Sequence, residues 1–190
     1  MYLFDNDIAS CLTHLQNGGI ILYPTDTVWG IGCDATNASA VAKIYALKKR
    51  EDSKAMIVLV ADEKEILEYV EQTDLMIFDY IKGIHKPTTV IYENAKGLAH
   101  NLVASDRSVA IRICKDSFCK QLIQLFGKPI VSTSANISGY PTPLCFSDIS
   151  LDIVEGVDYV VQYRQQEQEM HSPSSIVRWD QEGNLIIIRP

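Results

Sequence analysis

Periodic runs of apolar residues divide the first part of the chain into a helix, a strand, a loop and a second helix. Residues 5–17 place apolar side chains at helical spacing and end at a glycine pair, which predicts a helix. Residues 19–24 are an apolar run ended by a proline, so we expect a strand there. Residues 25–32, rich in hydroxyls and glycine, predict a structured loop. Asn37 is suited to cap a helix that runs to about Lys49.

Lys48 lies on the apolar stripe of this second helix. It follows Val41 by seven residues, so its side chain is expected to point toward the protein interior. Residues 55–60 come next as a continuous apolar run, which is typical of a strand covered on both faces.

The rest of the chain continues to alternate between strand and helix patterns. We expect one or two helices over 62–82, strands at 88–92, 108–113 and 157–161, a helix over 116–126, a solvated loop over 164–170, and a hairpin that joins 174–179 to 184–189. Strands interleaved with helices and ended by a hairpin predict a single α/β domain, residues 1–190, with a twisted mixed parallel and antiparallel sheet flanked by helices.

Residues 129–143 begin as an apolar strand and then change to hydroxyl and amide side chains. Because side chains alternate along a strand, Ser132 and Ser134 share one face, and Asn136 follows them into a turn. Such donors beside free backbone N–H groups suit an anionic or ribose-bearing ligand. The alternative is a turn whose polar side chains satisfy only their own backbone.

The strand at 108–113 also has one apolar and one polar face. Ser108 and Arg112 share the face opposite Val109, Ile111 and Ile113. This face supplies either a hydroxyl and a cation to a site or an ordinary exposed surface.

Lys48, Arg50 and Lys54 form a basic cluster where the second helix meets the next strand. Cations are generally favourable at a helix C-terminus, but three of them spread beyond the helix end could also neutralise a triphosphate. Residues 30–35 match the dinucleotide-binding pattern G-x-G-x-x-A. The preceding strand ends too early and the helix begins too late for that site, so we do not favour it.

Composition narrows the function classes. The chain has 190 residues, of which 47% are hydrophobic and 22% charged, and its net charge is −7. This acidic balance argues against a general nucleic-acid-binding surface. The five cysteines show no metal-ligand or Cys-x-x-Cys spacing, and the sequence contains no leader pattern or long apolar span. We therefore expect a cytoplasmic protein with free thiols.

Several motifs together resemble the YrdC/Sua5 family, in the same order along nearly the whole chain. They are Tyr-Pro-Thr-Asp-Thr-Val-Trp-Gly-Ile-Gly (23–32), Lys-x-Arg (48–50), Ser-Val-Ala-Ile-Arg (108–112), Ser-Thr-Ser-Ala-Asn-Ile-Ser-Gly (132–139), Ser-Ser-Ile-Val (174–177) and the terminal Ile-Arg-Pro (188–190). The resemblance implies a YrdC-like domain in its short, single-domain form. It also implies threonylcarbamoyl-AMP synthase activity, which joins L-threonine, bicarbonate and ATP, releases pyrophosphate and serves t6A modification of tRNA.

The resemblance also implies the ligand contacts. The residues expected to contact ATP are Arg50, Lys54, Ser108, Ser134, Asn136, Thr142 and Arg189. Those expected to contact threonine are Thr27, Arg112, Ser132 and Ser174. Lys48 and Arg50 are expected to stabilise charge, Mg²⁺ is expected with ATP, and no covalent nucleophile or protein metal ligand is implied.

The sequence departs from the family pattern at four places: Glu51, Ala55-Met56, the segment 85–88 and the segment 114–117. The departures at Glu51 and 114–117 lie next to expected ligand positions. The related YciO branch shares the fold but lacks the Lys-x-Arg and Ser-x-Asn residues present here. Two alternatives stay open: a non-catalytic RNA-binding module of the same fold, in which RNA or tRNA would be the partner, and a carbamoyl-chemistry enzyme of the hydrogenase-maturation type.

Overall fold

The computed structural model describes residues 3–49, 56–71, 73, 76–169, 171–180 and 182–190. Within these residues, nine strands form one sheet in the order β7-β1-β2-β6-β3-β5-β4-β8-β9. The strands are β1 (Ile21–Tyr23), β2 (Gly30–Gly32), β3 (Ile57–Val60), β4 (Thr88–Tyr92), β5 (Val109–Ile113), β6 (Ile130–Ser134), β7 (Tyr159–Val160), β8 (Ser175–Trp179) and β9 (Leu185–Arg189). The β1–β7, β3–β5 and β4–β8 pairs are parallel and the other neighbours are antiparallel, so the mixed sheet predicted from the sequence is confirmed.

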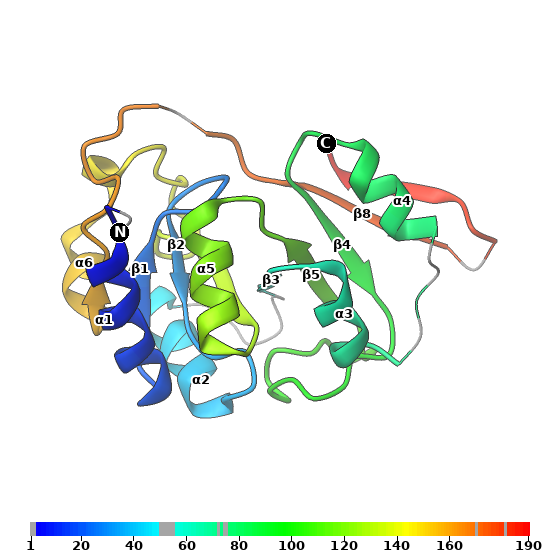
Figure 1. Cartoon of the computed structure of the whole chain (residues 1–190), viewed down its shortest axis with the longest axis horizontal. Coiled ribbons are helices and arrows are strands. Elements are labelled where there is room, and N and C mark those ends of the chain that lie inside the picture. The colour runs from blue at the N-terminus through cyan, green and yellow to red at the C-terminus, as the bar shows by residue number, and fades with distance from the viewer. Residues whose placement is uncertain (1–2, 50–55, 72, 74–75, 170, 181) are drawn as a thin grey trace.

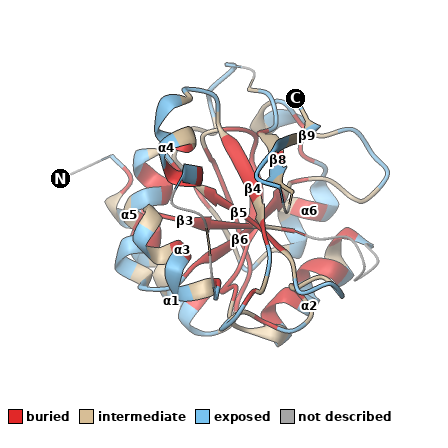
Figure 2. Ribbon diagram, turned by 90° about the vertical axis from the view of Figure 1, so that its right-hand side faces the viewer, coloured by how far each residue is buried: buried red, intermediate tan, exposed pale blue. Residues whose placement is uncertain are grey.

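Helices cover both faces of this sheet (Figure 1). They are α1 (Asp5–Gln16), α2 (Ala38–Lys48), α3 (Glu63–Tyr69), α4 (Met76–Gly83), α5 (Ser117–Phe126) and α6 (Leu151–Gly156). Figure 2 shows the buried strands β3, β5 and β6 between α1, α3 and α5 on one side and α2 and α6 on the other. The two-sided cover explains why these strands carry apolar residues on both faces.

Local sequence signals set the ends of two helices as expected. The Asn37 side chain accepts the backbone N–H groups of Ser39 and Ala40 at 3.0 and 3.2 Å, which caps α2. Gly127 ends α5 in the left-handed conformation, with φ of 71°. Each helix therefore begins or ends where its capping residue predicts.

The predicted loop over residues 25–32 is partly wrong, because its last three residues form β2. Glycine disfavours strands, yet here it permits close packing: a Cβ on Gly32 would lie 2.6 Å from the Val131 carbonyl oxygen and from the Tyr23 ring. A Cβ on Gly30 would lie 2.9 Å from the Ser132 hydroxyl. The two glycines thus belong to a central strand, which removes the context that a dinucleotide-binding loop requires.

Two further expectations are only partly met near the end of the chain. The strand predicted over 157–161 is confined to β7. The segment after β7 crosses the top of the molecule to reach β8 (Figure 1) and includes residues 164–169. This tract was expected to be solvated, and its residues 166–169 are exposed. At its start, however, the Arg164 side chain is only 13% exposed and pairs with Asp116, because the segment passes over the N-terminus of α5.

A single core unites most elements, built from buried apolar residues of β1 to β6 and the inner faces of the helices. None of the described helices is both long and apolar enough to cross a bilayer.

Candidate functional site

The strand ends and loops on one side of the sheet enclose a cavity of about 260 Å³. Its lining comes from segments far apart in sequence: the loop before β2, the start of β3, β5, the end of β6, the start of β8 and the end of β9. We call it the first cavity. Seven of the predicted ligand residues line it: Thr27, Arg112, Ser132, Ser134, Thr142, Ser174 and Arg189.

All four residues expected to contact threonine are therefore brought together in the first cavity. The register explains how: Ser132 lies opposite Ile57 of β3, and Leu59, two residues further along β3, lies opposite Arg112 of β5. The Thr27 hydroxyl lies 3.0 Å from that of Thr25, which also accepts the Thr27 backbone N–H. These contacts hold Thr27 in the turn just before β2.

Arg112 supplies a buried cation to the first cavity. Its side chain is 4% exposed, and one terminal nitrogen lies 3.0 Å from Oδ1 of Asp26. The other Asp26 oxygen accepts the backbone N–H of Lys115 at 3.3 Å. The alternation in β5 correctly predicted that Arg112 would leave the core face, but the acidic partner was not predicted.

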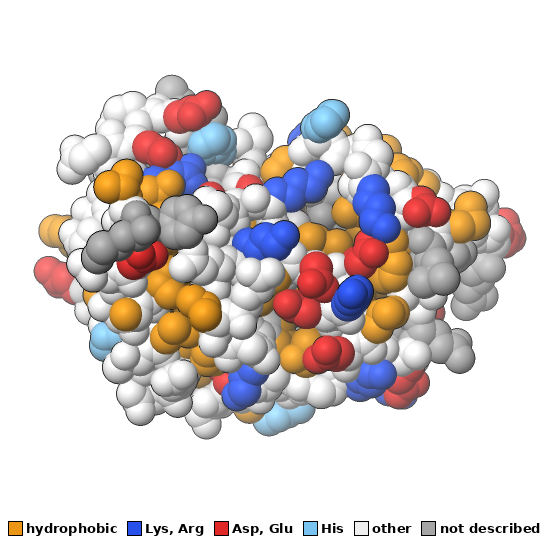
Figure 3. Space-filling model, viewed as in Figure 1, with side chains coloured by type: hydrophobic (Ala, Val, Ile, Leu, Met, Phe, Trp, Pro, Cys, Tyr) orange, Lys and Arg blue, Asp and Glu red, His pale blue; other side chains and the backbone are white. Residues whose placement is uncertain are grey.

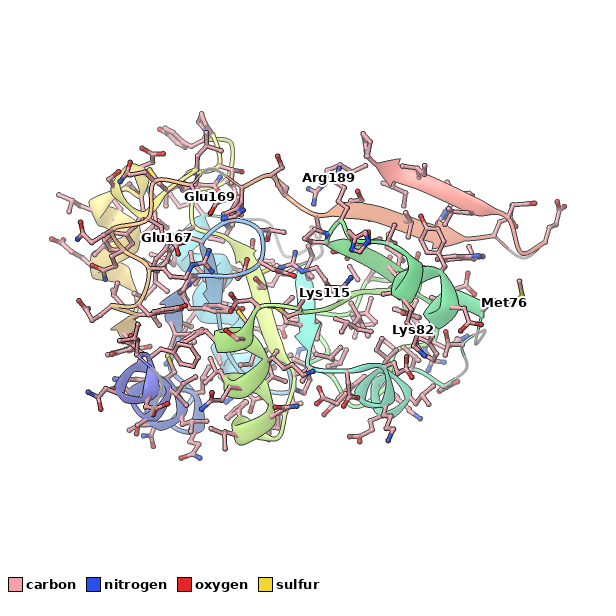
Figure 4. The ribbon with its side chains drawn as sticks, turned by 45° about the horizontal axis from the view of Figure 1, so that its top comes forward. Met76, Lys82, Lys115, Glu167, Glu169 and Arg189 are labelled. Carbon is pink, nitrogen blue, oxygen red and sulfur yellow. The ribbon has the colours of Figure 1, made fainter. Side chains whose placement is uncertain are left out.

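A second guanidinium, that of Arg189, reaches the same cavity from the C-terminal strand. Figure 4 shows it extending from β9 toward the middle of the molecule. Its Nε donates to the Ser174 carbonyl oxygen at 2.9 Å, and the Ser174 hydroxyl lies 2.8 Å from that of Thr89. Burial, and then the charge of Arg112, lower the pKa of Arg189 from its usual value. The cavity therefore concentrates positive charge in a poorly solvated place, which favours an anionic ligand.

Lys48 is 1% exposed, which confirms that it points inward. Its ammonium donates to the backbone carbonyl oxygens of Ser134 and Asn136. Its own carbonyl accepts the Ser138 N–H at 2.9 Å, so the end of α2 holds the polar turn after β6 at three points. Lys48 does not line the first cavity, and its predicted role in charge stabilisation stays a prediction.

A second, larger cavity of about 560 Å³ lies next to the first, and Thr142 lines both. Asn136 lines this second cavity rather than the first. Its amide nitrogen donates to the carbonyl oxygens of Ile137 and Tyr140 at 3.0 and 2.8 Å, while its Oδ1 is buried without a hydrogen-bond partner among the described residues. Asn136 thus shapes the turn and still presents one free acceptor.

Three predicted ATP contacts are not placed in this site. Arg50 and Lys54 lie outside the described residues. Ser108 lines neither cavity, and its backbone N–H donates to the Asp106 carboxylate at 2.9 Å. Hydrogen bonds from Ser108, with its hydroxyl making the largest contribution, lower the pKa of Asp106.

Sequence reasoning missed Asp26 and Arg164. Arg164 donates to the Thr25 carbonyl oxygen at 3.2 Å and to Asp116 at 3.1 Å, so it ties the crossing segment to the turn that carries Thr27. Figure 4 shows Glu167 on that segment, near this turn. For Asp26, the one signal in the sequence is its position in the motif, between Thr25 and Thr27.

Mg²⁺ was predicted to come with ATP and without a protein ligand set, and this stays a prediction. Among the described residues there is no group of three or more His, Cys, Asp or Glu side chains that could hold a metal ion. The lining of the first cavity includes hydroxyls and guanidinium groups and no carboxylate. The second cavity, by contrast, includes the carboxylates of Asp148 and Asp152 in its lining.

Comparisons with known proteins agree on one family. The Sua5/YciO/YrdC family model, described as telomere recombination, matches residues 13–190. The threonylcarbamoyl-AMP synthase of Pseudoalteromonas translucida (strain TAC 125) is 34% identical over 157 residues, which cover 81% of this chain and 84% of that protein.

Solved structures extend the likeness to the fold. Sua5 of P. abyssi, solved in complex with L-threonine, superimposes with a TM-score of 0.87 at 20% identity over all of this chain and 55% of its own. This chain therefore spans about half of that protein. E. coli YciO superimposes with a TM-score of 0.82 at 18% identity, covering 97% of this chain and 88% of its own. At such identities the superpositions establish the shared fold.

Proposed function

This chain belongs to the Sua5/YciO/YrdC family, and from that premise we propose that it is a threonylcarbamoyl-AMP synthase. The enzyme would join L-threonine, bicarbonate and ATP and release pyrophosphate. One observation carries the proposal: Thr27, Arg112, Ser132 and Ser174, which the family motifs assign to threonine, line one cavity although they come from four separate segments. The relative at 34% identity bears the same name.

The reaction needs no covalent enzyme nucleophile. The amine of threonine and bicarbonate give a carbamate and water. A carbamate oxygen then attacks the α-phosphorus of ATP, forming a new P–O bond while the bond to pyrophosphate breaks. The protein's contribution would be to hold the reactants in line and to offset charge on the phosphates.

The cavities divide naturally between the substrates. A volume of about 260 Å³ is below the roughly 300–1,000 Å³ typical of sites for larger ligands, so the first cavity suits the amino acid better than a nucleotide. The second cavity, of about 560 Å³, offers the additional room. Two residues assigned to ATP by motif connect the cavities. Thr142 lines both, and Ser134 lines the first next to Ala135, which lines the second.

In this arrangement Arg112 would bind the free α-carboxylate of threonine, because a guanidinium fork matches a carboxylate. Thr27, Ser132 and Ser174 would orient its hydroxyl and amine. Arg189 would face the phosphates from the lining of the first cavity, and the family motifs assign Arg50 and Lys54 to the same phosphates. Mg²⁺ would arrive as Mg·ATP, with phosphate oxygens and water as its ligands.

RNA contact is a separate proposal. The net charge is −7, and Figure 3 shows lysine, arginine and acidic side chains mixed on one face rather than a continuous basic surface. We propose that any tRNA contact and any partnership with t6A-modification proteins follow adenylate formation, in a cytoplasmic setting.

The proposal is tested by incubating the protein with ATP, bicarbonate and isotope-labelled threonine and identifying the products by mass spectrometry. We expect pyrophosphate and a labelled threonylcarbamoyl adenylate. Tight RNA binding without either product would favour the non-catalytic module instead. AMP that forms without incorporation of label would show that the adenylated substrate is another molecule.

A further inference from the structure

We propose that Asp26 sorts the two anionic substrates of this site. Its carboxylate reserves the Arg112 guanidinium for the single charge of an amino-acid carboxylate and keeps the triphosphate of ATP from occupying the same place. The inference rests on the proposed function, because it assumes that one carboxylate and one polyphosphate bind side by side.

The first step is the isolation of the ion pair. The side chains of Asp26 and Arg112 are 10% and 4% exposed, so solvent screens their charges little. Lys115, the nearest cation in sequence, contributes only its backbone N–H to Asp26, while its ammonium donates to the Ile84 carbonyl oxygen at 2.7 Å. Among the described residues, Arg112 is the only cation in ion-pair contact with Asp26.

The second step is the incomplete use of the guanidinium. Oδ1 of Asp26 lies 3.0 Å from one terminal nitrogen of Arg112, yet neither this oxygen nor Nε of Arg112 has a hydrogen-bond partner among the described residues, so the pair is held by charge. A guanidinium carries five N–H donors, and a buried donor left unpaired is costly. Because Arg112 lines the first cavity, a ligand oxygen is the natural partner for the donors that Asp26 leaves free.

The third step is a comparison of the two ligands. Without Asp26, the guanidinium groups of Arg112 and Arg189 would give the cavity two positive charges, a strong site for phosphates. Asp26 cancels one of them. Its repulsion grows with the charge of the ligand, so it opposes a triphosphate several times more strongly than a carboxylate, whereas the directed hydrogen bonds of the fork remain available to the carboxylate.

The fourth step is the wider charge pattern. Glu167 and Glu169 line a small recess that shares Thr27 and Trp29 with the first cavity. Arg164 lines the same recess and pairs with Glu167, so this pair offsets one of the two negative charges beside Thr27. Arg189 lines the first cavity but not this recess, so the cation that the motifs assign to the phosphates is apart from these acids.

The test compares Asp26→Asn, which keeps the shape and removes the charge, with Asp79→Asn. Asp79 is exposed on α4, so this control changes the net charge equally at a distance from the site. Inorganic tripolyphosphate, without magnesium, is titrated into each protein by calorimetry, and threonine is titrated with and without it. We expect Asp26→Asn to bind tripolyphosphate on the order of tenfold more tightly than Asp79→Asn and wild type.

In wild type, tripolyphosphate should leave the threonine affinity unchanged, whereas in Asp26→Asn it should compete with threonine. Asp26→Glu, which restores the charge, should show no gain in tripolyphosphate affinity. Competition in the wild-type protein would overturn the proposal, and this result does not depend on the folding of any variant. A folded Asp26→Asn protein with wild-type tripolyphosphate affinity would also overturn it. Failure of wild type to bind threonine at all would instead remove the proposed substrate, while the tripolyphosphate comparison still decides the sorting role.

Discussion

Replacing Arg112 with leucine should separate recognition of threonine from binding of ATP. The substitution removes the only guanidinium that the motifs assign to the threonine carboxylate, and it leaves Asp26 without its buried cation. We expect both a loss of threonine affinity and a loss of stability. The two losses differ in size, and a second substitution should restore only the stability.

The binding defect follows from one lost charge-assisted contact. Such a contact contributes about 1.5–3 kcal/mol, which corresponds to a loss of threonine affinity of roughly 10- to 150-fold. ATP affinity should change much less, because Arg189, Arg50 and Lys54 would remain. The stability defect follows from leaving the carboxylate of Asp26, 10% exposed, unpaired. Breaking a buried pair in this way costs about 3–5 kcal/mol, or roughly 6–20 °C in Tm for a chain of this size.

A second substitution distinguishes the two defects. In Arg112→Leu combined with Asp26→Asn, no unpaired charge remains, so most of the lost Tm should return while threonine binding stays weak. Calorimetric titrations of threonine and of ATP, with thermal denaturation of each variant, measure all the required quantities. Wild-type threonine affinity in the folded double variant would refute the assignment. Equal losses of threonine and ATP affinity would show that Arg112 serves the phosphates.

Three further predictions concern the frame of the site. Lys48→Met should reduce Tm and lower ATP affinity more than threonine affinity, because the ammonium holds the carbonyl oxygens of the turn at 134–136. Equal ATP affinities of mutant and wild type in calorimetric titrations would contradict this. Gly32→Ala should destabilise the fold by about 1–3 kcal/mol in denaturant titrations because its Cβ would meet backbone at 2.6 Å, whereas Gly83→Ala, with nothing within 4 Å, should be nearly neutral. Arg50→Ala should reduce turnover roughly 10- to 150-fold with an unchanged Tm; a large Tm loss with normal turnover per folded molecule would make Arg50 structural.

Strand alternation and helix caps, which depend on residues close together in sequence, were predicted correctly. The period-two pattern placed Arg112 away from the core face and put Ser132 and Ser134 on one face. Both expectations match the lining of the first cavity, which includes all three residues. The cap of α2 at Asn37 and the end of α5 at Gly127 follow from the preferences of single residues. Such features need only neighbours in sequence.

Features that depend on distant partners could not be predicted. β2 was interpreted as a loop because glycine disfavours strands, and only the close approach of Val131 explains why Gly32 lies in one. The pair of Asp26 and Arg112 joins a turn to a strand 86 residues away, and no pattern in either segment indicates the other. Arg164 likewise pairs with Asp116 only because the crossing segment lies over α5.

The central claim, synthesis of threonylcarbamoyl-AMP, is tested most directly by the rate of pyrophosphate release in an omission series. Reactions contain ATP and magnesium with both threonine and bicarbonate, with each alone, or with neither. We predict release only when both are present, since the carbamate that attacks the α-phosphorus requires both. Release at the same rate without threonine, or in reactions depleted of bicarbonate, would contradict the account.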